Sequence, residues 1–124
     1  MADNNSPDRA VILSSEAPAP LPFLSQAIRD GNTVFCSGQI AVDPSTGKLV
    51  GGTVEDRTRR ILENLSAVLK SAGSSLSLAN KVNIYLVKPE DFGAMNKVYE
   101  TFFTDVKPAR TCVFVKALPL NTDV

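Results

Sequence analysis

The sequence predicts a small α+β domain in which two helices pack on one face of a β-sheet. Residues 108–119 alternate strictly between two sets of side chains and are bounded by prolines, which is typical of a strand. Residues 53–73 repeat apolar side chains at three- and four-residue steps, which is typical of an amphipathic helix. Taken with the shorter runs around them, the predicted order is hairpin, strand, long helix, strand, helix, strand.

The composition is that of an ordinary globular domain and argues against several classes of function. The chain has 124 residues, of which 44% are hydrophobic and 21% charged, and 13 basic residues balance 13 acidic ones. One domain is therefore expected, with no basic field to recruit nucleic acid and no apolar run long enough for a membrane span. The chain has no histidine, which excludes a Ser-His or Cys-His nucleophile.

Residues 1–8 are expected to form a disordered leader ahead of a single domain at residues 9–124. This leader carries acid and lacks an apolar core, so it does not resemble a signal peptide. It also lacks the arginines of a mitochondrial presequence. A cytoplasmic location is therefore the default expectation, with a mitochondrial one as the alternative.

The first third of the chain predicts short strands and tight turns. Strands are expected at residues 9–13, 23–28 and 33–37. Asp30-Gly31-Asn32 is a hairpin signal between the last two strands. Gly38 then ends the third strand at a point where a backbone or a ligand could approach closely. Residues 43–47 form a second turn with glycine at its end.

The long helix has both of its ends marked. Thr53 can cap its first turn, where acidic residues meet the positive end of the helix dipole, and Gly73 can end it. The expected buried stripe consists of Val54, Thr58, Ile61, Leu62, Leu65, Val68, Leu69 and Ala72. A stripe of this kind is a core surface.

A strand at residues 78–87 and a second helix follow. Alternate residues of this strand fall into two sets, Val82, Ile84 and Leu86 against Lys81, Asn83 and Tyr85. Pro89 opens the second helix, whose stripe consists of Phe92, Met95, Tyr99, Phe102 and Phe103. Asn96 lies beside that stripe, either as a satisfied core amide or as a group that faces a ligand.

The last predicted strand, bounded by Pro108 and Pro119, carries Arg110. Its guanidinium can bind a carboxylate through two parallel hydrogen bonds, and an internal ion pair is the alternative. We expect Tyr85, Arg110, Cys112 and Phe114 to share a sheet face that no helix covers and that a partner subunit covers instead. Cys36 and Cys112 are expected to be buried, reduced thiols.

Seven short motifs occur in one order and together resemble the Rid family of reactive enamine/imine deaminases, also labelled as endoribonucleases or translation inhibitors. The resemblance runs from about Pro18 to the last residue. The motifs are Ser25-Gln26-Ala27-Ile28, Ser37-Gly38-Gln39-Ile40, Asp43-Pro44-x-x-Gly47, Asn64-Leu65, Asn96-x-x-Tyr99-x-x-Phe102-Phe103, Pro108-Ala109-Arg110 and Leu118-Pro119.

The resemblance implies a chorismate-mutase-like fold of the bacillus type, assembled as a homotrimer with ligand clefts between subunits. It implies 2-iminobutanoate/2-iminopropanoate deaminase activity, in which 2-aminoacrylate and related enamine or imine products of pyridoxal-phosphate enzymes are hydrolysed to 2-keto acids and ammonia. The family uses no metal or organic cofactor. The implied partners are a small imino acid and two further copies of the chain, with neither a membrane nor nucleic acid.

By position, Arg110 matches the family's carboxylate-binding arginine and is the expected catalytic residue. Ser37, Gly38, Asn96 and Cys112 match residues that line the cleft. Phe23 stands where the family commonly has an aromatic hydroxyl, which phenylalanine lacks. The family's chain also continues past Leu118-Pro119 into a last strand that begins with a glutamate, whereas this sequence ends at Val124.

The resemblance therefore implies a domain without that strand, and we expect weak imine hydrolysis from it. Two other functions remain as alternatives. A non-catalytic trimer that binds small carboxylates is favoured by Phe23 and by the missing glutamate. RNA cleavage is the least expected function, because the net charge is zero and the cluster of Arg57, Arg59 and Arg60 is interrupted by acidic residues.

Overall fold

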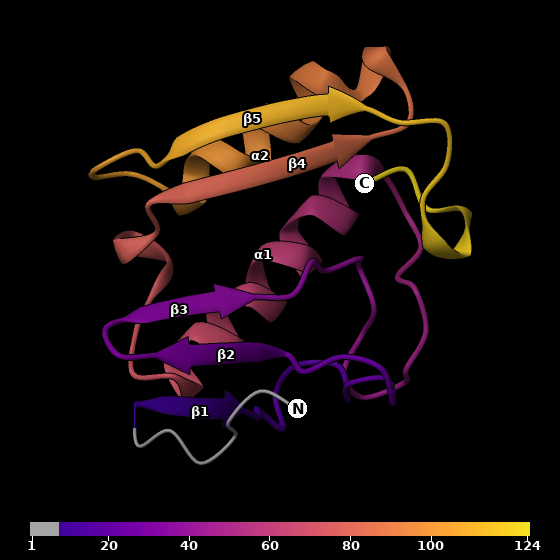
Figure 1. Ribbon diagram of the computed structural model, residues 1–124. Coiled ribbons are helices and arrows are strands. Elements are labelled where there is room, and N and C mark those ends of the chain that lie inside the picture. Colours follow the sequence, from indigo (N-terminus) through magenta and orange to yellow (C-terminus); the bar gives the residue numbers. More distant parts are fainter. Residues whose placement is uncertain (1–7) are drawn as a thin grey trace.

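The computed structural model describes residues 8–124 and confirms an α+β fold with two helices (Figure 1). Strands β1 (Arg9–Ile12), β2 (Ala27–Asp30) and β3 (Thr33–Cys36) form an antiparallel sheet. Strands β4 (Lys81–Leu86) and β5 (Ala109–Phe114) form a second, parallel sheet. Helix α1 (Val54–Ser71) precedes β4, and helix α2 (Phe92–Phe102) connects β4 to β5. Of the expected leader, only Asp8 lies within the described residues.

The single expected sheet is thus divided in two. β3 and β4 are edge strands of their own sheets, and no pairing between them occurs within residues 8–124. Helix α1 passes behind both sheets and links them (Figure 1). Two apolar clusters result, one between α1 and the antiparallel sheet and the other between both helices and the β4–β5 sheet.

Helix α1 begins and ends where the sequence predicts. The Thr53 hydroxyl accepts the Asp56 amide and the Asp56 carboxylate accepts the Thr53 amide, which completes a capping box. At the other end Gly73 has φ +79°, and the Gly73 and Ser74 amides bind the carbonyls of Lys70 and Leu69. Both ends are set by local side-chain and backbone chemistry, which explains why the sequence located them.

Several predicted strands have shifted bounds. The strand expected at 23–28 begins at Ala27, because Leu21 and Leu24 close a turn around Pro22 and a hydrogen bond of 3.2 Å joins their backbones. The strand expected at 78–87 begins at Lys81, since a 3-10 turn occupies Leu76–Leu78. The last strand ends at Phe114, well before Pro119.

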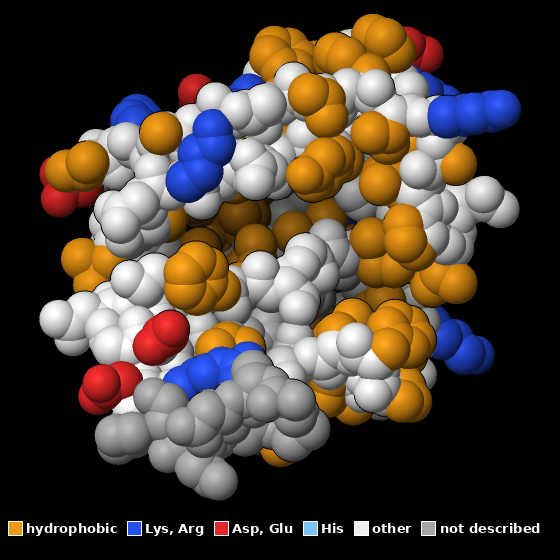
Figure 2. Space-filling model, viewed as in Figure 1, with side chains coloured by type: hydrophobic (Ala, Val, Ile, Leu, Met, Phe, Trp, Pro, Cys, Tyr) orange, Lys and Arg blue, Asp and Glu red, His pale blue; other side chains and the backbone are white. Residues whose placement is uncertain are grey.

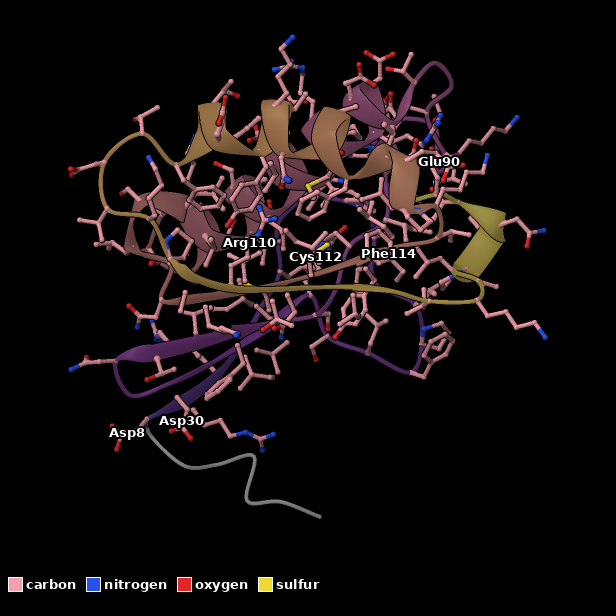
Figure 3. All side chains as sticks on the ribbon, turned by 90° about the horizontal axis from the view of Figure 1, so that it is seen from above. Asp8, Asp30, Glu90, Arg110, Cys112 and Phe114 are labelled. Atoms are coloured by element: carbon pink, nitrogen blue, oxygen red, sulfur yellow. The ribbon has the colours of Figure 1, made fainter. Side chains whose placement is uncertain are left out.

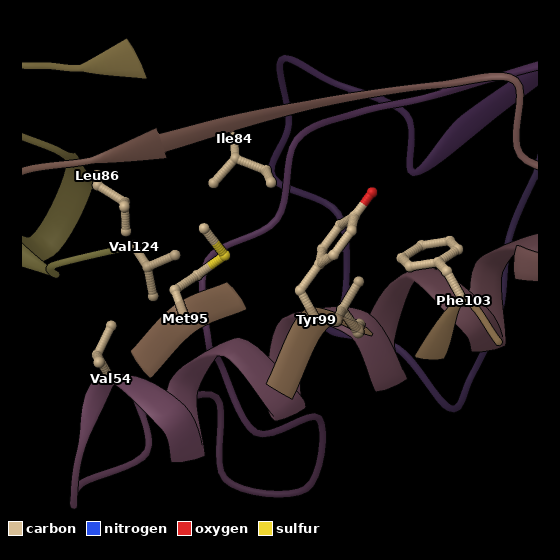
Figure 4. Packing of buried hydrophobic residues seen from close by; sticks show 8 residues of the cluster. Val54, Ile84, Leu86, Met95, Tyr99, Phe103 and Val124 are labelled. Carbon is tan, nitrogen blue, oxygen red and sulfur yellow. The ribbon is translucent and has the colours of Figure 1, made fainter. Parts of the chain in front are cut away.

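The core of the second sheet confirms the predicted alternation of β4. Ile84 and Leu86 are buried, whereas Lys81, Asn83 and Tyr85 are exposed. Leu86 is fully buried and packs in one cluster with Met95, Tyr99 and Val124 (Figure 4). This cluster holds α1 and α2 against one face of the sheet.

A groove separates the two sheets, and we call it the central groove. It has a volume of about 1180 Å³ and is lined by β3, β4 and one side of α1. Figure 2 shows it as a hollow across the molecule with hydrophobic side chains at its floor. Ile61, Leu65 and Leu69, expected in the buried stripe of α1, line this floor and are only partly buried.

The C-terminal residues are fastened beside the groove by an ion pair. The Arg57 Nε and Nη2 atoms each donate to one carboxylate oxygen of Asp123 at 2.7 Å. The Val87 amide also donates to the Asp123 carbonyl at 3.2 Å, and Val124 is buried in the core. The last two residues therefore belong to the folded structure.

This ion pair makes part of the stability depend on pH. The hydrogen bond from Arg57 holds the pKa of Asp123 below its ordinary value, and burial opposes that shift. The resulting stability is present above the unfolded pKa of about 3.9 and is lost as pH falls through the lower folded pKa. We expect Asp123→Asn to lower the free energy of unfolding by about 1 kcal/mol at pH 7.

Urea unfolding of wild type and Asp123→Asn at pH 7 and near pH 2 measures the effect. The two proteins should converge at the acidic pH. Asp105→Asn, which changes an exposed carboxylate, is the matched control. A difference between wild type and Asp123→Asn that stays constant over this range would contradict the assignment.

Candidate functional site

Arg110 lies on the face of the second sheet that α2 covers, which corrects the expected placement. The parallel register sets Arg110 beside Val82, Cys112 beside Ile84 and Phe114 beside Leu86. Because neighbouring residues in register point to the same side of a sheet, these side chains share the buried face of β4. Figure 3 shows all three pointing from β5 toward α2.

Tyr85 lies on the opposite face with Thr111 and Val113, and this face has no helix over it. Tyr85 and Val113 are 48% and 40% exposed. The sequence was therefore right that one sheet face is left uncovered but wrong to place Arg110, Cys112 and Phe114 on it. Alternation along one strand separates two faces, and only the pairing of strands shows which face the helix takes.

Two aromatic rings of α2 hold the guanidinium of Arg110. Its Cζ atom lies 4.8 Å from the ring centre of Tyr99 and 5.8 Å from that of Phe92. Both distances are in the range of cation–π attraction. The Phe92 ring also meets Phe114, with ring centres 6.3 Å apart, and this contact closes one side of the site.

Arg110 forms no ion pair within the described part of the chain. The internal partner that the sequence allowed as an alternative is therefore absent from residues 8–124. A half-buried guanidinium whose donors are not matched by a carboxylate retains its capacity to bind one.

Two polar atoms of α2 nearby lack partners. The Asn96 Oδ1 and Tyr99 Oη atoms are buried and have no hydrogen-bond partner among the described residues. Asn96 lies one turn from both Phe92 and Tyr99, so it shares the face of α2 that contacts Arg110. Buried polar atoms are nearly always satisfied, so this pair indicates a place for a polar ligand or water.

The electrostatics of the site favour neutral side chains around one cation. Burial raises the pKa of Tyr99, and the positive charge of Arg110 partly offsets that rise. Burial likewise raises the pKa of Cys112, again partly offset by Arg110. Tyr99 therefore stays a hydroxyl donor at neutral pH, and Cys112 stays a thiol that lines the site.

The other expected site residues lie elsewhere on the chain. Ser37 follows β3, where its hydroxyl donates to the Ser25 carbonyl at 2.6 Å, and both Ser37 and Gly38 line the central groove. A side-chain carbon at Gly38 would meet no atom within 4 Å, so this backbone borders open space. Phe23 is 81% exposed in the turn before β2.

The site residues thus fall into two groups on one chain. Arg110, Cys112 and Asn96 gather between β5 and α2, whereas the remaining three lie toward the antiparallel sheet. Tyr99 was predicted as a core residue and as part of the motif Asn96-x-x-Tyr99, but sequence reasoning did not identify its hydroxyl as a candidate site group. Its three-residue spacing from Asn96 was the available signal.

Both cysteines are free, but they are less buried than expected. Cys36 is exposed at the end of β3, and Cys112 is partly buried. Within residues 8–124, no group of three or more acidic, cysteine or histidine side chains is placed to hold a metal ion. No helix among these residues is long and apolar enough to cross a membrane.

Comparison with known proteins places this geometry in a family. The family described as Endoribonuclease L-PSP matches residues 14–124. A RutC family protein of Pyrococcus horikoshii is 47% identical over 111 residues, which cover 90% of this chain and 88% of that protein. The rat protein named 2-iminobutanoate/2-iminopropanoate deaminase is 41% identical over 116 residues, covering 94% and 85% of the two chains.

A solved structure agrees with these relatives. The crystal structure of Escherichia coli TdcF with bound serine superposes with a TM-score of 0.87 at 33% identity, covering 92% of this chain and 91% of that one. The arrangement of helices and sheets described above is therefore shared with a protein whose structure was solved with an amino acid bound.

Proposed function

Since the chain belongs to the Endoribonuclease L-PSP family, which includes the Rid and RutC proteins, we propose that it is a 2-iminobutanoate/2-iminopropanoate deaminase. The observation that carries the proposal is the guanidinium of Arg110, which has no carboxylate partner within residues 8–124 and lies against two rings beside the buried Asn96 and Tyr99 oxygens. This arrangement suits a small 2-imino acid, which offers a carboxylate and a polar C=N group side by side.

In the proposed reaction, Arg110 binds the carboxylate of the substrate through two parallel hydrogen bonds. Water adds to the C2 atom of the imine, and the C=N double bond becomes a single bond. One water proton moves to the nitrogen to give a 2-amino-2-hydroxy acid. The hydroxyl proton then also moves to the nitrogen as the C–N bond breaks and the C=O double bond forms. The products are a 2-keto acid and ammonia, so atoms and charge balance without a cofactor.

The side chains around Arg110 position the substrate and exclude water on one side. The Tyr99 hydroxyl is protonated at neutral pH because burial raises its pKa, so it can donate to the substrate nitrogen or oxygen. The Asn96 Oδ1 atom can accept a hydrogen bond from an N–H of the developing amine. These are positioning contacts, worth most when the substrate is already held by its carboxylate.

We propose further that the chain forms a homotrimer of the chorismate-mutase-like type, with sites between subunits. The division of the site residues into two groups supports this, because two subunits could bring the groups together. The exposed apolar side chains of Tyr85 and Val113 on the uncovered sheet face support it as well. Sedimentation equilibrium tests the assembly, and a monomer at micromolar concentration would contradict it.

A competition assay tests the activity. A threonine dehydratase generates 2-iminobutanoate in the presence of semicarbazide, which traps the imine before it hydrolyses. We expect the chain to reduce semicarbazone formation in proportion to its concentration while 2-ketobutanoate accumulates faster. The same chain after heat denaturation is the control. Equal semicarbazone formation with and without native protein would refute the activity.

A non-catalytic carboxylate-binding protein is the second candidate, and the exposed, hydroxyl-free Phe23 favours it. It predicts saturable binding of 2-ketobutanoate, measured by calorimetry, in a protein that leaves semicarbazone formation unchanged. The cytoplasmic location is a proposal as well, and fractionation of cells that express the tagged chain tests it.

A further inference from the structure

We infer that the side chain of the substrate lies against the rings of Phe92 and Phe114, which make the site selective for 2-imino acids with a branched apolar side chain. The imine derived from leucine is the expected type, in preference to the imine derived from alanine. This inference rests on the proposed function and deepens it, because it assigns the one group of the substrate that the mechanism leaves unplaced.

The C2 atom of a 2-imino acid carries three groups in one plane, namely a carboxylate, the C=N nitrogen and a side chain. The carboxylate is bound by the guanidinium of Arg110, which has no acidic partner within residues 8–124. The nitrogen suits the buried Asn96 Oδ1 and Tyr99 Oη atoms, which can accept or donate a hydrogen bond. These contacts leave the side chain without a binding surface of its own.

The face of α2 that contacts Arg110 changes from apolar to polar along the helix. Phe92 begins the helix, Asn96 follows one turn later, and Tyr99 lies nearly two turns from Phe92. Two turns span about 11 Å, so a guanidinium 5.8 Å from one ring centre and 4.8 Å from the other lies between the rings. An apolar group on C2 therefore finds an all-carbon ring at the N-terminal end of α2.

Phe114 extends this apolar surface along β5. Its ring centre lies 6.3 Å from that of Phe92, and the two ring planes are inclined by 58°, so the rings form a corner. Arg110, Cys112 and Phe114 point to the same side of the sheet (Figure 3). Since alternate side chains of a strand are about 6.7 Å apart, Cys112 lies beneath a molecule that extends from Arg110 toward Phe114.

Both rings keep a large free surface. Phe92 and Phe114 are 42% and 46% exposed although they contact each other, whereas Met95 and Leu86 on the same two layers are buried. An apolar group that covers the corner removes this surface from water, which favours its binding. The corner is therefore a suitable place for an apolar side chain of the substrate.

The dimensions of the site fit a side chain of about four carbons. A carboxylate bound through two parallel hydrogen bonds places C2 about 5.5 Å from the Cζ atom of Arg110. The ring centre of Phe92 lies 5.8 Å from the same Cζ atom. A methyl group extends about 1.5 Å from C2 and ends beside Phe92, whereas an isobutyl group extends about 4 Å and reaches the corner with Phe114.

The expected selectivity follows from the apolar surface that is buried. Each methylene group removed from water contributes about a factor of four to affinity, and an isobutyl group has three more carbons than a methyl group. Because the two rings cover one side of the group and leave the other open, we expect kcat/KM to be about tenfold higher for the leucine-derived imine. Most of this difference should be a lower KM, since the contact exists before the reaction begins.

Competition assays with two imines test the selectivity. An amino acid oxidase with catalase forms the imine of leucine or of alanine in the presence of semicarbazide, and the decrease in semicarbazone gives kcat/KM for each. The leucine-to-alanine ratio should be about ten for wild type and about two for Phe114→Gln, which replaces the ring with a polar group. Phe114→Leu should restore a ratio above about five. Val106→Ala, at a residue 71% exposed between α2 and β5, should leave the ratio of wild type.

Calorimetry with two 2-keto acids separates this inference from the proposed reaction. Wild type should bind 4-methyl-2-oxopentanoate about tenfold more tightly than pyruvate, and Phe114→Gln should reduce this difference to about twofold. If this pattern holds but no imine is hydrolysed, the deaminase function is wrong and the apolar subsite stands. If imines are hydrolysed with a wild-type ratio near one, or if folded Phe114→Gln keeps the ratio of wild type, the subsite is wrong. Absence of binding of both keto acids at millimolar concentration would overturn it as well.

Discussion

Replacing Arg110 with alanine should reduce kcat/KM for 2-iminobutanoate by about 100-fold. The guanidinium has no acidic partner within residues 8–124, so the change leaves no buried carboxylate unpaired. It removes two charge-assisted hydrogen bonds to the substrate, together worth about 3 kcal/mol, and 1.36 kcal/mol corresponds to a factor of ten. Because the carboxylate is bound in both the ground state and the transition state, most of the loss should be a higher KM.

Two further variants separate geometry from charge. Arg110→Lys keeps the positive charge but cannot donate two parallel hydrogen bonds to a carboxylate. We expect kcat/KM to fall by an intermediate factor of about ten. Arg59→Ala, which removes an exposed arginine from α1, should leave the kinetics unchanged. The semicarbazide competition assay measures all three, and circular dichroism checks that each is folded. A folded Arg110→Ala protein with full activity would show that the guanidinium does not bind the substrate.

The largest loss of stability is expected from Leu86→Ala. Leu86 is fully buried where β4, α2 and the C-terminal residues meet, and the truncation leaves a cavity that rigid neighbours cannot fill. Such changes cost about 3 kcal/mol, within a range of 2–5 kcal/mol. For a domain of this size we expect Tm to fall by about 10 °C.

Leu78→Ala is the matched control, since the same atoms are removed from a side chain that is 67% exposed. Its free energy of unfolding should change by less than about 0.5 kcal/mol. Urea unfolding of the two variants beside wild type measures the difference. Equal effects of the two substitutions would show that Leu86 is not part of the folding core.

Features that depend on nearby residues were predictable from the sequence. The cap at Thr53, the end of α1 at Gly73 and the two faces of β4 all follow from contacts within a few residues. The buried polar residues Gln26 and Asn64 were not identified as core groups. Asn64 accepts a hydrogen bond from Arg60 one turn earlier, but the other partners are backbone atoms 8 to 22 residues away, among them the carbonyl oxygens of Pro18 and Val42, and no local pattern reveals these.

The candidate site was predictable in its residues but not in its placement. The resemblance named Arg110, Cys112 and Asn96, and the structure brings all three to one region. The sequence did not show that Arg110 faces α2. This orientation depends on the pairing of β5 with β4, whose residues are almost 30 positions earlier in the chain. The sequence also did not single out the Tyr99 hydroxyl, because an aromatic residue in the apolar stripe of a helix is expected to pack in the core.

The recessed position of the β3 and β4 edges has a consequence for aggregation. Open strand edges usually invite another sheet to add on, which is the first step toward fibrils. Here both edges lie in a hollow rather than on a rim. The walls of the central groove therefore stand between these two edges and the flat edge of a neighbouring sheet. The recess thus protects these two edges from sheet-to-sheet addition, while β1 and β5 are the edges on the outer sides of the two sheets.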